Sequence, residues 1–281
     1  MLDDQLLTYF RENDCVDFYV EQEGEVAFSH IVEKVLNMHT KSDLFDDMLE
    51  GCIFYNEQKN ALVRGQPIKL MDLDEIPSPY TTGLFDEFFD GNYYPIIYTT
   101  RGCPFTCNFC VQSDAYFNKI RRTDRSEVIK DLHYIAERIS DTPAKNLYNA
   151  ESNFGMYKHD KIVSETIAEL QHTHGWPLTM FASSGKNFDA VMDNTKAIHK
   201  SFEFCMSVQS MDMEVLEEIG RKNIPPHKYK KASEVLQAAG QSTLGETIVP
   251  LPKETLQTYL DGVKTLIEWG VKRLVTNNLM V

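Results

Sequence analysis

Residues 95–281 alternate between two patterns of apolar and polar positions. Short β-branched and aromatic runs, such as 95–100, are followed by segments whose apolar residues recur every three or four positions. The first pattern predicts strands and the second amphipathic helices. Further strands are predicted at 146–149, 177–182, 202–208, 242–249 and 271–276. Helices are predicted at 126–139, with Ser126 as N-cap, and at 160–172, 189–199, 213–221, 226–239 and 253–269.

Repeated strand–helix units predict parallel strands joined by right-handed crossovers, with helices outside. Six units curve most naturally into an incomplete (β/α)6 TIM-like barrel, and an open doubly wound α/β sheet is the alternative. A barrel strand is normally followed by a covering helix. The chain ends on the sixth predicted strand and residues 277–281, so we expect a truncated chain.

Residues 1–92 follow a different pattern. They predict a strand at 16–20, a helix at 26–36 and a hairpin from 51–55 and 61–64. A proline-punctuated linker follows at 73–80. We therefore expect two domains: the remnant of a small α/β domain with its linker at 1–92, and the partial barrel at 93–281.

Composition and charge argue against a nucleic-acid-binding or membrane-spanning protein. The 281 residues are 42% hydrophobic and 25% charged, which is ordinary for a globular protein. The net charge of −14 argues against extended nucleic-acid contact, which needs a basic surface. One basic cluster, Lys119, Arg121, Arg122 and Arg125, predicts a solvated loop or, alternatively, an anion clamp. The chain has neither a membrane-length apolar run nor a secretory leader pattern, so a cytoplasmic protein without a membrane partner is expected.

The most specific motif is the run from Arg101 to Cys110, which places Cys103, Cys107 and Cys110 at Cys-x3-Cys-x2-Cys spacing. Three thiolates can hold three irons of a 4Fe–4S cluster and leave the fourth iron open to a ligand. A structural zinc site or a ferredoxin cluster would need a fourth ligand, and the next histidine is His133. The other cysteines, at positions 15, 52 and 205, are expected to be small buried residues.

This loop, including Phe109 before the last cysteine, resembles the cluster loop of the radical S-adenosylmethionine (radical SAM) enzymes. The resemblance implies that the open iron chelates the amino and carboxylate groups of SAM. One electron then cleaves a C–S bond and gives a 5′-deoxyadenosyl radical. It also implies an electron donor such as flavodoxin or ferredoxin, and a small-molecule or peptide substrate that the sequence does not identify. Phe109 is expected beside SAM.

Polar residues follow the predicted strands. In a (β/α) barrel the active site lies at the C-terminal ends of the strands. Glu151 follows the second strand and could hold the SAM amino group, or lie in water as an ordinary loop carboxylate. Ser184 and Lys186 follow the third strand. Lys186 could pair with the SAM carboxylate or the substrate, although a lone loop lysine is more often solvated.

The fourth predicted strand ends in a stretch that resembles the family's QS…L…R signature. The resemblance implies that Gln209 and Ser210 face the SAM ribose and that Arg221 meets its carboxylate. A guanidinium suits this role because it can donate two parallel hydrogen bonds. The alternative for Arg221 is a charge at a helix C-terminus. After the fifth strand, Pro250 and Lys253 replace family glycines, which puts the usual adenine contact in doubt.

The N-terminal layout is similar to the tail of the cobalamin-binding domain that precedes the barrel in one branch of the family. It shares an EGE turn at 23–25, a helix and a DL-x-x-I-P-x-P linker from residue 72. The cobalamin signature Asp-x-His-x-x-Gly is absent. If a full-length parent binds cobalamin, the implied reaction is methyl transfer to an unactivated carbon or phosphorus, or a ring rearrangement.

The sequence therefore leaves two hypotheses for the function. The first is a radical SAM enzyme, with methyl transfer as the reaction if cobalamin is bound. The second is a non-catalytic iron–sulfur or zinc protein that uses the cysteine loop for electron transfer or structure. The open fourth ligand position and the polar strand ends favour the first.

Overall fold

The computed structural model describes residues 3–70, 72–198 and 201–280. It divides into two compact units, residues 1–72 and 73–281. The proline-punctuated stretch at 73–80 groups with the second unit. Each unit is described by itself.

The first unit is a small antiparallel sheet with two helices. Its elements are α1 (Asp3–Glu12), β1 (Tyr19–Val20), α2 (Gly24–Asn37), β2 (Cys52–Asn56) and β3 (Ala61–Arg64), with strand order β1-β2-β3. Leu6 and Phe10 of α1 pack on Ile53 of β2, which forms a small core. The hairpin and α2 confirm the sequence prediction. Helix α1 was not predicted.

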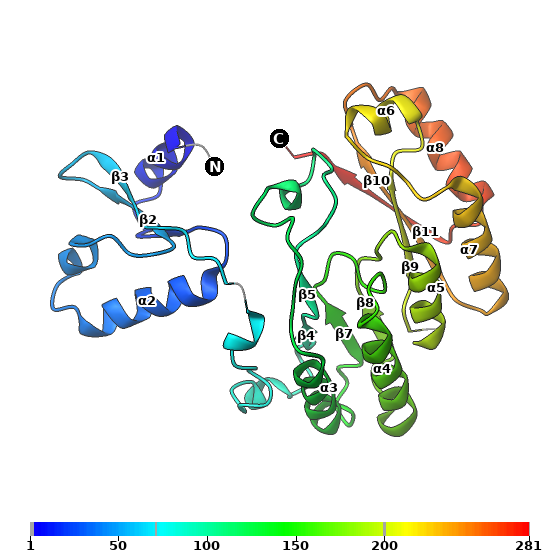
Figure 1. Ribbon diagram of the computed structural model, residues 1–281, viewed down its shortest axis with the longest axis horizontal. Helices are drawn as coiled ribbons and strands as arrows, with labels where there is room; N and C mark the ends of the chain where they lie inside the picture. Colours follow the sequence, from blue (N-terminus) through cyan, green and yellow to red (C-terminus); the bar gives the residue numbers. More distant parts are fainter. Residues whose placement is uncertain (1–2, 71, 199–200, 281) are drawn as a thin grey trace. The chain divides into compact units, whose positions relative to one another are not determined.

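The second unit is an α/β structure in which six parallel strands follow each other in sequence order (Figure 1). These strands are β4 (Ile96–Ile97), β7 (Asn146–Asn149), β8 (Thr179–Phe181), β9 (Phe204–Gln209), β10 (Thr243–Val249) and β11 (Arg273–Asn278). A parallel bridge between Met180 and Phe202 joins the β4-β7-β8 sheet to the segment leading into β9. Because the described order contains no reversal, it lacks the switch point of a doubly wound sheet.

Helices connect the strands as the repeated units predict. They are α3 (Arg125–Ile139), α4 (Asp160–His174), α5 (Phe188–Ala197), α6 (Met213–Glu218), α7 (Pro226–Ala238) and α8 (Leu256–Glu268). The predicted end of the fourth-strand helix at Arg221 was wrong, because α6 ends at Glu218. Residue His199, the predicted end of another helix, lies outside the described residues.

Two local predictions at the start of this unit need correction. The predicted strand at 95–100 is broken into β4 and β5 (Thr100–Arg101), and β5 pairs antiparallel with β6 (Arg121–Arg122). The N-cap of α3 is Asp124 rather than Ser126, because the Asp124 carboxylate accepts a hydrogen bond from the Ser126 backbone N–H at 2.7 Å.

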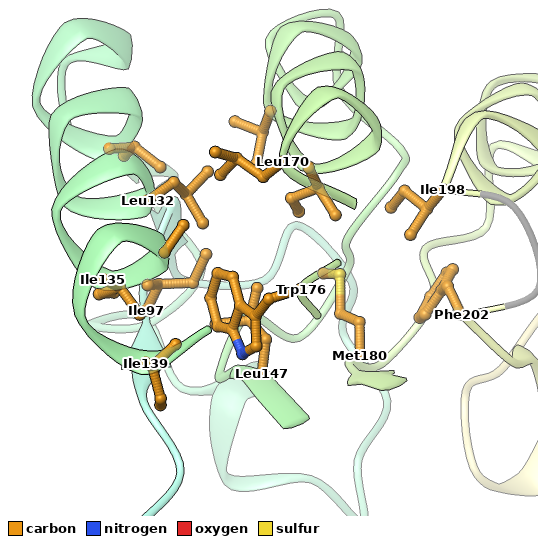
Figure 2. Close-up of a cluster of buried hydrophobic side chains, with 14 of the residues drawn as sticks. Ile97, Leu132, Ile135, Ile139, Leu147, Leu170, Trp176, Met180, Ile198 and Phe202 are labelled. Atoms are coloured by element: carbon orange, nitrogen blue, oxygen red, sulfur yellow. The ribbon is translucent and has the colours of Figure 1, made fainter. Parts of the chain in front are cut away.

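The larger core lies between the strands and helices α3 and α4, around the fully buried Trp176 (Figure 2). Leu147 of β7 points into this core with 0% of its surface exposed, whereas its neighbour Tyr148 is 48% exposed. Met180 and Phe181 of β8 alternate in the same way. Since successive strand residues point to opposite faces, the helices cover one face of these strands and leave the other accessible.

No helix in the described part of the chain is long and apolar enough to cross a bilayer.

Candidate active site at the cysteine loop

The backbone at Gly102 fixes the entry to the cysteine loop. Its φ of +99° is a conformation that glycine adopts readily, and a Cβ here would lie 2.4 Å from the Lys119 carbonyl oxygen. The Cys103 N–H then donates to the Phe117 carbonyl at 2.9 Å. The loop therefore closes tightly against the segment that returns from it, and only glycine fits at its start.

The far side of the loop is tied to helix α6. The Asn108 N–H donates to the Ile219 carbonyl at 3.2 Å, and its side-chain amide donates to the Glu218 carbonyl at 2.9 Å. The Phe109 ring packs against a small apolar cluster that includes Val215 and Leu251. These contacts hold the loop at the C-terminal ends of the strands, where β9 leads into α6.

Two cationic side chains approach the thiols. Cys107 is 6% exposed, and Cys103 and Cys110 are half-buried. An Arg221 guanidinium nitrogen lies 3.6 Å from the Cys107 sulfur, within hydrogen-bonding reach. Burial and the Arg221 charge lower the pKa of the Lys186 ammonium, and the charges of Cys107 and Cys103 act in the opposite direction. We name Cys103, Cys107, Cys110, Lys186 and Arg221 the thiol–cation cluster.

Lys186 and Arg221 are held in place by other groups. Lys186 donates to the Lys222 carbonyl at 3.1 Å, and its ammonium lies 4.3 Å from the centre of the Phe105 ring. Arg221 donates to the Ser207 carbonyl and, at 2.9 Å, to the amide oxygen of Asn223. These contacts fix both cations beside the cysteine loop.

Asn223 was missed from the sequence. Its amide donates to the backbone carbonyls of Val208 and Ser210, at 2.9 and 3.0 Å, so it links the arginine to the end of β9. Its position two residues after the signature arginine was the only sequence signal.

The end of β9 carries an unusual backbone. Gln209 has a φ of +64°, and its buried side-chain oxygen has no hydrogen-bond partner in the described structure. A non-glycine residue in this region is strained, and such strain is concentrated at functional sites. The next hydroxyl, Ser210, donates to Glu254 at 2.9 Å, and burial raises the pKa of that carboxyl. The Ser184 hydroxyl accepts the Cys205 N–H at 3.2 Å.

Glu151 contacts a different group of side chains. It is 3% exposed, one carboxylate oxygen accepts a hydrogen bond from Thr99, and the other has no partner in the described structure. Burial, followed by the neighbouring Asp160 carboxylate, raises the pKa of Glu151 to about 8. Of the two alternatives for Glu151, the water-exposed loop carboxylate is excluded, because Glu151 is buried.

Comparison with known proteins identifies the family. The sequence pattern of the Radical SAM superfamily matches residues 97–266, which is more than half of the chain. The chain belongs to the Radical SAM superfamily.

Two curated proteins are similar in sequence to this superfamily member. It is 29% identical over 272 residues to the cobalamin-dependent radical SAM methyltransferase TokK of Streptomyces tokunonensis, covering 93% of this chain and 39% of TokK. It is 28% identical over 273 residues, with the same coverage of both chains, to a 2-(S-pantetheinyl)-carbapenam-3-carboxylate methyltransferase of Streptantibioticus cattleyicolor. The chain thus spans about two fifths of the length of these relatives.

A solved structure shares the fold of this superfamily member. The radical SAM methyltransferase TsrM of Kitasatospora setae, with cobalamin and a 4Fe–4S cluster bound, superposes with a TM-score of 0.66. The sequences are 15% identical, and the match covers 97% of this chain and 52% of TsrM. Radical SAM enzymes use a 4Fe–4S cluster and SAM, act on a substrate and need a reductant.

Two further expectations about this radical SAM chain are corrected. Cys15 is exposed rather than buried, although Cys52 and Cys205 are buried as expected. The basic cluster is not a simple solvated loop, because Arg121 is buried, with its guanidinium 5.5 Å from the centre of the Tyr116 ring.

Proposed function

We propose that this chain is the catalytic core of a radical SAM enzyme, with a 4Fe–4S cluster on Cys103, Cys107 and Cys110. The thiol–cation cluster carries the proposal. Three thiols on one closed loop are the donor set that iron prefers, and two fixed cations lie beside them. When bound, the cluster and SAM together supply a 5′-deoxyadenosyl radical that abstracts hydrogen from the substrate.

We assign the SAM carboxylate to Arg221 and Lys186. Both cations are fixed within reach of the thiol loop, and Arg221 can donate two parallel hydrogen bonds to a carboxylate. Gln209 and Ser210 are proposed to face the ribose, because the unpartnered Gln209 oxygen can accept from a hydroxyl. Ser184 and Phe109 complete the proposed SAM set, both from segments around the loop. The predicted contact of Glu151 with the SAM amino group stays a prediction.

The six strands in sequence order and their one-sided helices support an incomplete (β/α)6 barrel. We propose that its catalytic part begins near residue 93 and that residues 1–92 derive from the tail of a cobalamin-binding domain. The TokK, carbapenam methyltransferase and TsrM likenesses favour cobalamin-dependent methyl transfer as the reaction of the whole enzyme. The reductant is proposed to be a flavodoxin or ferredoxin, and the location cytoplasmic.

The deciding experiment is electron paramagnetic resonance (EPR) of the anaerobically reconstituted, dithionite-reduced chain, with and without SAM. We expect a cubane signal that shifts when SAM is added, because SAM would bind the open iron. The matched variant is Arg221→Met, which removes one carboxylate partner and should weaken the SAM-induced shift while the cluster still assembles.

A cluster signal that is indifferent to SAM would contradict SAM binding and favour an electron-transfer protein. Zinc in place of iron would overturn the radical SAM assignment of this site.

A further inference from the structure

A second cluster of ligand-type side chains lies between β7 and α4. Glu151 follows β7, and His159 and Asp160 stand at the start of α4. One atom from each, two carboxylate oxygens and an imidazole nitrogen, lie within 4.8 Å of one another. Glu151 is 3% exposed and Asp160 is 0% exposed, while the His159 side chain is 12% exposed. We name these three residues the carboxylate cluster.

One buried oxygen of this cluster is unpartnered: Glu151 Oε1 has no hydrogen-bond partner in the described structure. Asp160 Oδ1 accepts no hydrogen bond there either, but it lies 2.9 Å from His159 Nε2, an ion pair when the imidazole is protonated. Their companion oxygens are engaged: Thr99 donates to Glu151 Oε2, and the Tyr157 N–H donates to Asp160 Oδ2 at 2.9 Å. Buried polar atoms without a partner are rare, and an ion or water at the site is one of the usual reasons for them.

His159 presents a third donor atom to the same place. Its Nε2 lies 2.9 Å from Asp160 Oδ1 and 2.9 Å from the Thr100 hydroxyl oxygen. With Nδ1 protonated, the Nε2 lone pair faces the two carboxylates. The Tyr157 ring stacks on the imidazole, with ring centres 5.5 Å apart and an angle of 12° between the planes, and so fixes its orientation.

Ionising both carboxyls would leave this cluster negative. Arg122, whose charge acts on Glu151, has its guanidinium 5.0 Å from the centre of the Tyr157 ring. With Glu151 and Asp160 both ionised and His159 neutral, the cluster and Arg122 carry a net charge of about −1, and a proton held on Glu151 brings this to zero. Buried like charges are strongly unfavourable unless a cation or a shared proton separates them.

We propose that Glu151, His159 and Asp160 hold a divalent transition-metal ion, such as Mn²⁺ or Zn²⁺, separate from the iron–sulfur cluster. Imidazole with carboxylates is a donor set that suits these ions. Ligand atoms about 2.1 Å from a tetrahedral ion lie roughly 3.4 Å apart. His159 Nε2 and Asp160 Oδ1, now 2.9 Å apart, would separate slightly, and all three atoms already lie within 4.8 Å of one another. The ion joins the end of β7 to the start of α4, and in this arrangement Glu151 serves the ion rather than SAM.

The test is a Mn²⁺ titration of the full chain with its iron–sulfur cluster oxidised, after removal of loosely bound metals with a chelator. The EPR sextet of free Mn²⁺ reports the unbound ion. We expect one bound Mn²⁺ per chain and at least tenfold weaker binding in Glu151→Gln and in Asp160→Asn. Glu165→Gln is the matched control, because Glu165 is an exposed carboxylate on the same helix and should leave binding unchanged.

A wild-type chain that binds no Mn²⁺, or binds it as well after Glu151→Gln and Asp160→Asn, would overturn the site. An infrared band of a protonated carboxyl that persists in excess Mn²⁺ and disappears in Glu151→Gln would show a shared proton instead. Should either carboxylate variant fail to fold, His159→Gln provides the same comparison at a partly exposed position. The SAM-induced EPR shift, measured with and without Mn²⁺, tests the proposed function independently.

Discussion

The thiol–cation cluster and the carboxylate cluster lie in the same unit but differ in the sign of their fixed charges. In the first, Lys186 and Arg221 approach thiols, so positive charge is fixed beside groups that must become negative. In the second, two buried carboxylates lie near the Arg122 charge, and in the described structure Glu151 Oε1 has no hydrogen-bond partner. The fixed cations of the first cluster favour a negatively charged group beside them, whereas the second favours a proton or a cation.

The largest effect is expected from a substitution in the thiol–cation cluster that leaves the carboxylate cluster unchanged. Cys107→Ala should abolish assembly of the iron–sulfur cluster, because Cys107 is the most buried of the three thiols and the one that Arg221 approaches. Iron and sulfide content would measure the loss, and circular dichroism should show unchanged helix content. Cys15→Ala, at an exposed position, is the control. Full iron and sulfide in Cys107→Ala would refute the ligand assignment.

Gly102→Ala should damage the thiol–cation cluster through the backbone. The added Cβ would meet the Lys119 carbonyl oxygen at 2.4 Å, so we expect a loss of about 2–4 kcal/mol in unfolding free energy. Gly175→Ala is the matched control, because Gly175 also has positive φ but nothing within 4 Å of the added Cβ, and should cost about 1 kcal/mol. Denaturant unfolding measures the loss of unfolding free energy in both variants. Equal losses would show that the contact between the added Cβ and the Lys119 carbonyl does not add to the cost at Gly102.

The carboxylate cluster should make stability depend on pH in metal-free protein. The pKa of Glu151 is about 8 in the folded chain, above its ordinary value of 4.5, so the folded state holds this proton more tightly than the unfolded state. Its contribution is therefore fully present below about pH 4.5 and is lost as pH rises towards 8, by a few kcal/mol at most. Glu151→Gln should flatten this fall, as measured by urea unfolding from pH 5 to 8. An unchanged pH profile would mean that Glu151 is already ionised in the folded chain.

The smallest expected effect concerns the support of Arg221. Asn223→Ala removes the amide that links the arginine to the end of β9, so SAM should bind about three- to tenfold more weakly. Cluster assembly should be unaffected, because the hydrogen bonds that the structure describes for Asn223 go to Arg221, Val208 and Ser210 and to no thiol. Asn187→Ala removes an exposed amide with a longer contact of 3.4 Å and should leave the SAM affinity unchanged. Equal SAM affinities in both variants would show that Arg221 needs no such support.

Sequence patterns predicted the strand–helix repeats of the second unit, because these follow from periodic apolar positions. The assignment of the three cysteines as cluster ligands rests on their contiguous spacing and stays a prediction. The predicted strand at 146–149 coincides with β7, and α7 differs by one residue. The break between β4 and β5 could not be predicted, since it depends on pairing with β6, twenty residues away. The carboxylate cluster was equally hidden, because its members come from separate segments and only folding brings them together.

The pairing of β5 with β6 has a consequence for the evolution of this family member. The chain leaves the parallel sheet at Thr100 and Arg101, carries the three cysteines, and returns to the same two-residue ladder at Arg121 and Arg122. Insertions between the two halves of such a ladder are tolerated cheaply, since lengthening a closed loop costs little entropy. A change of length between the two halves can thus be accommodated after Cys110, where the segment returns to β6, while Asn108 keeps the cysteine end bound to α6.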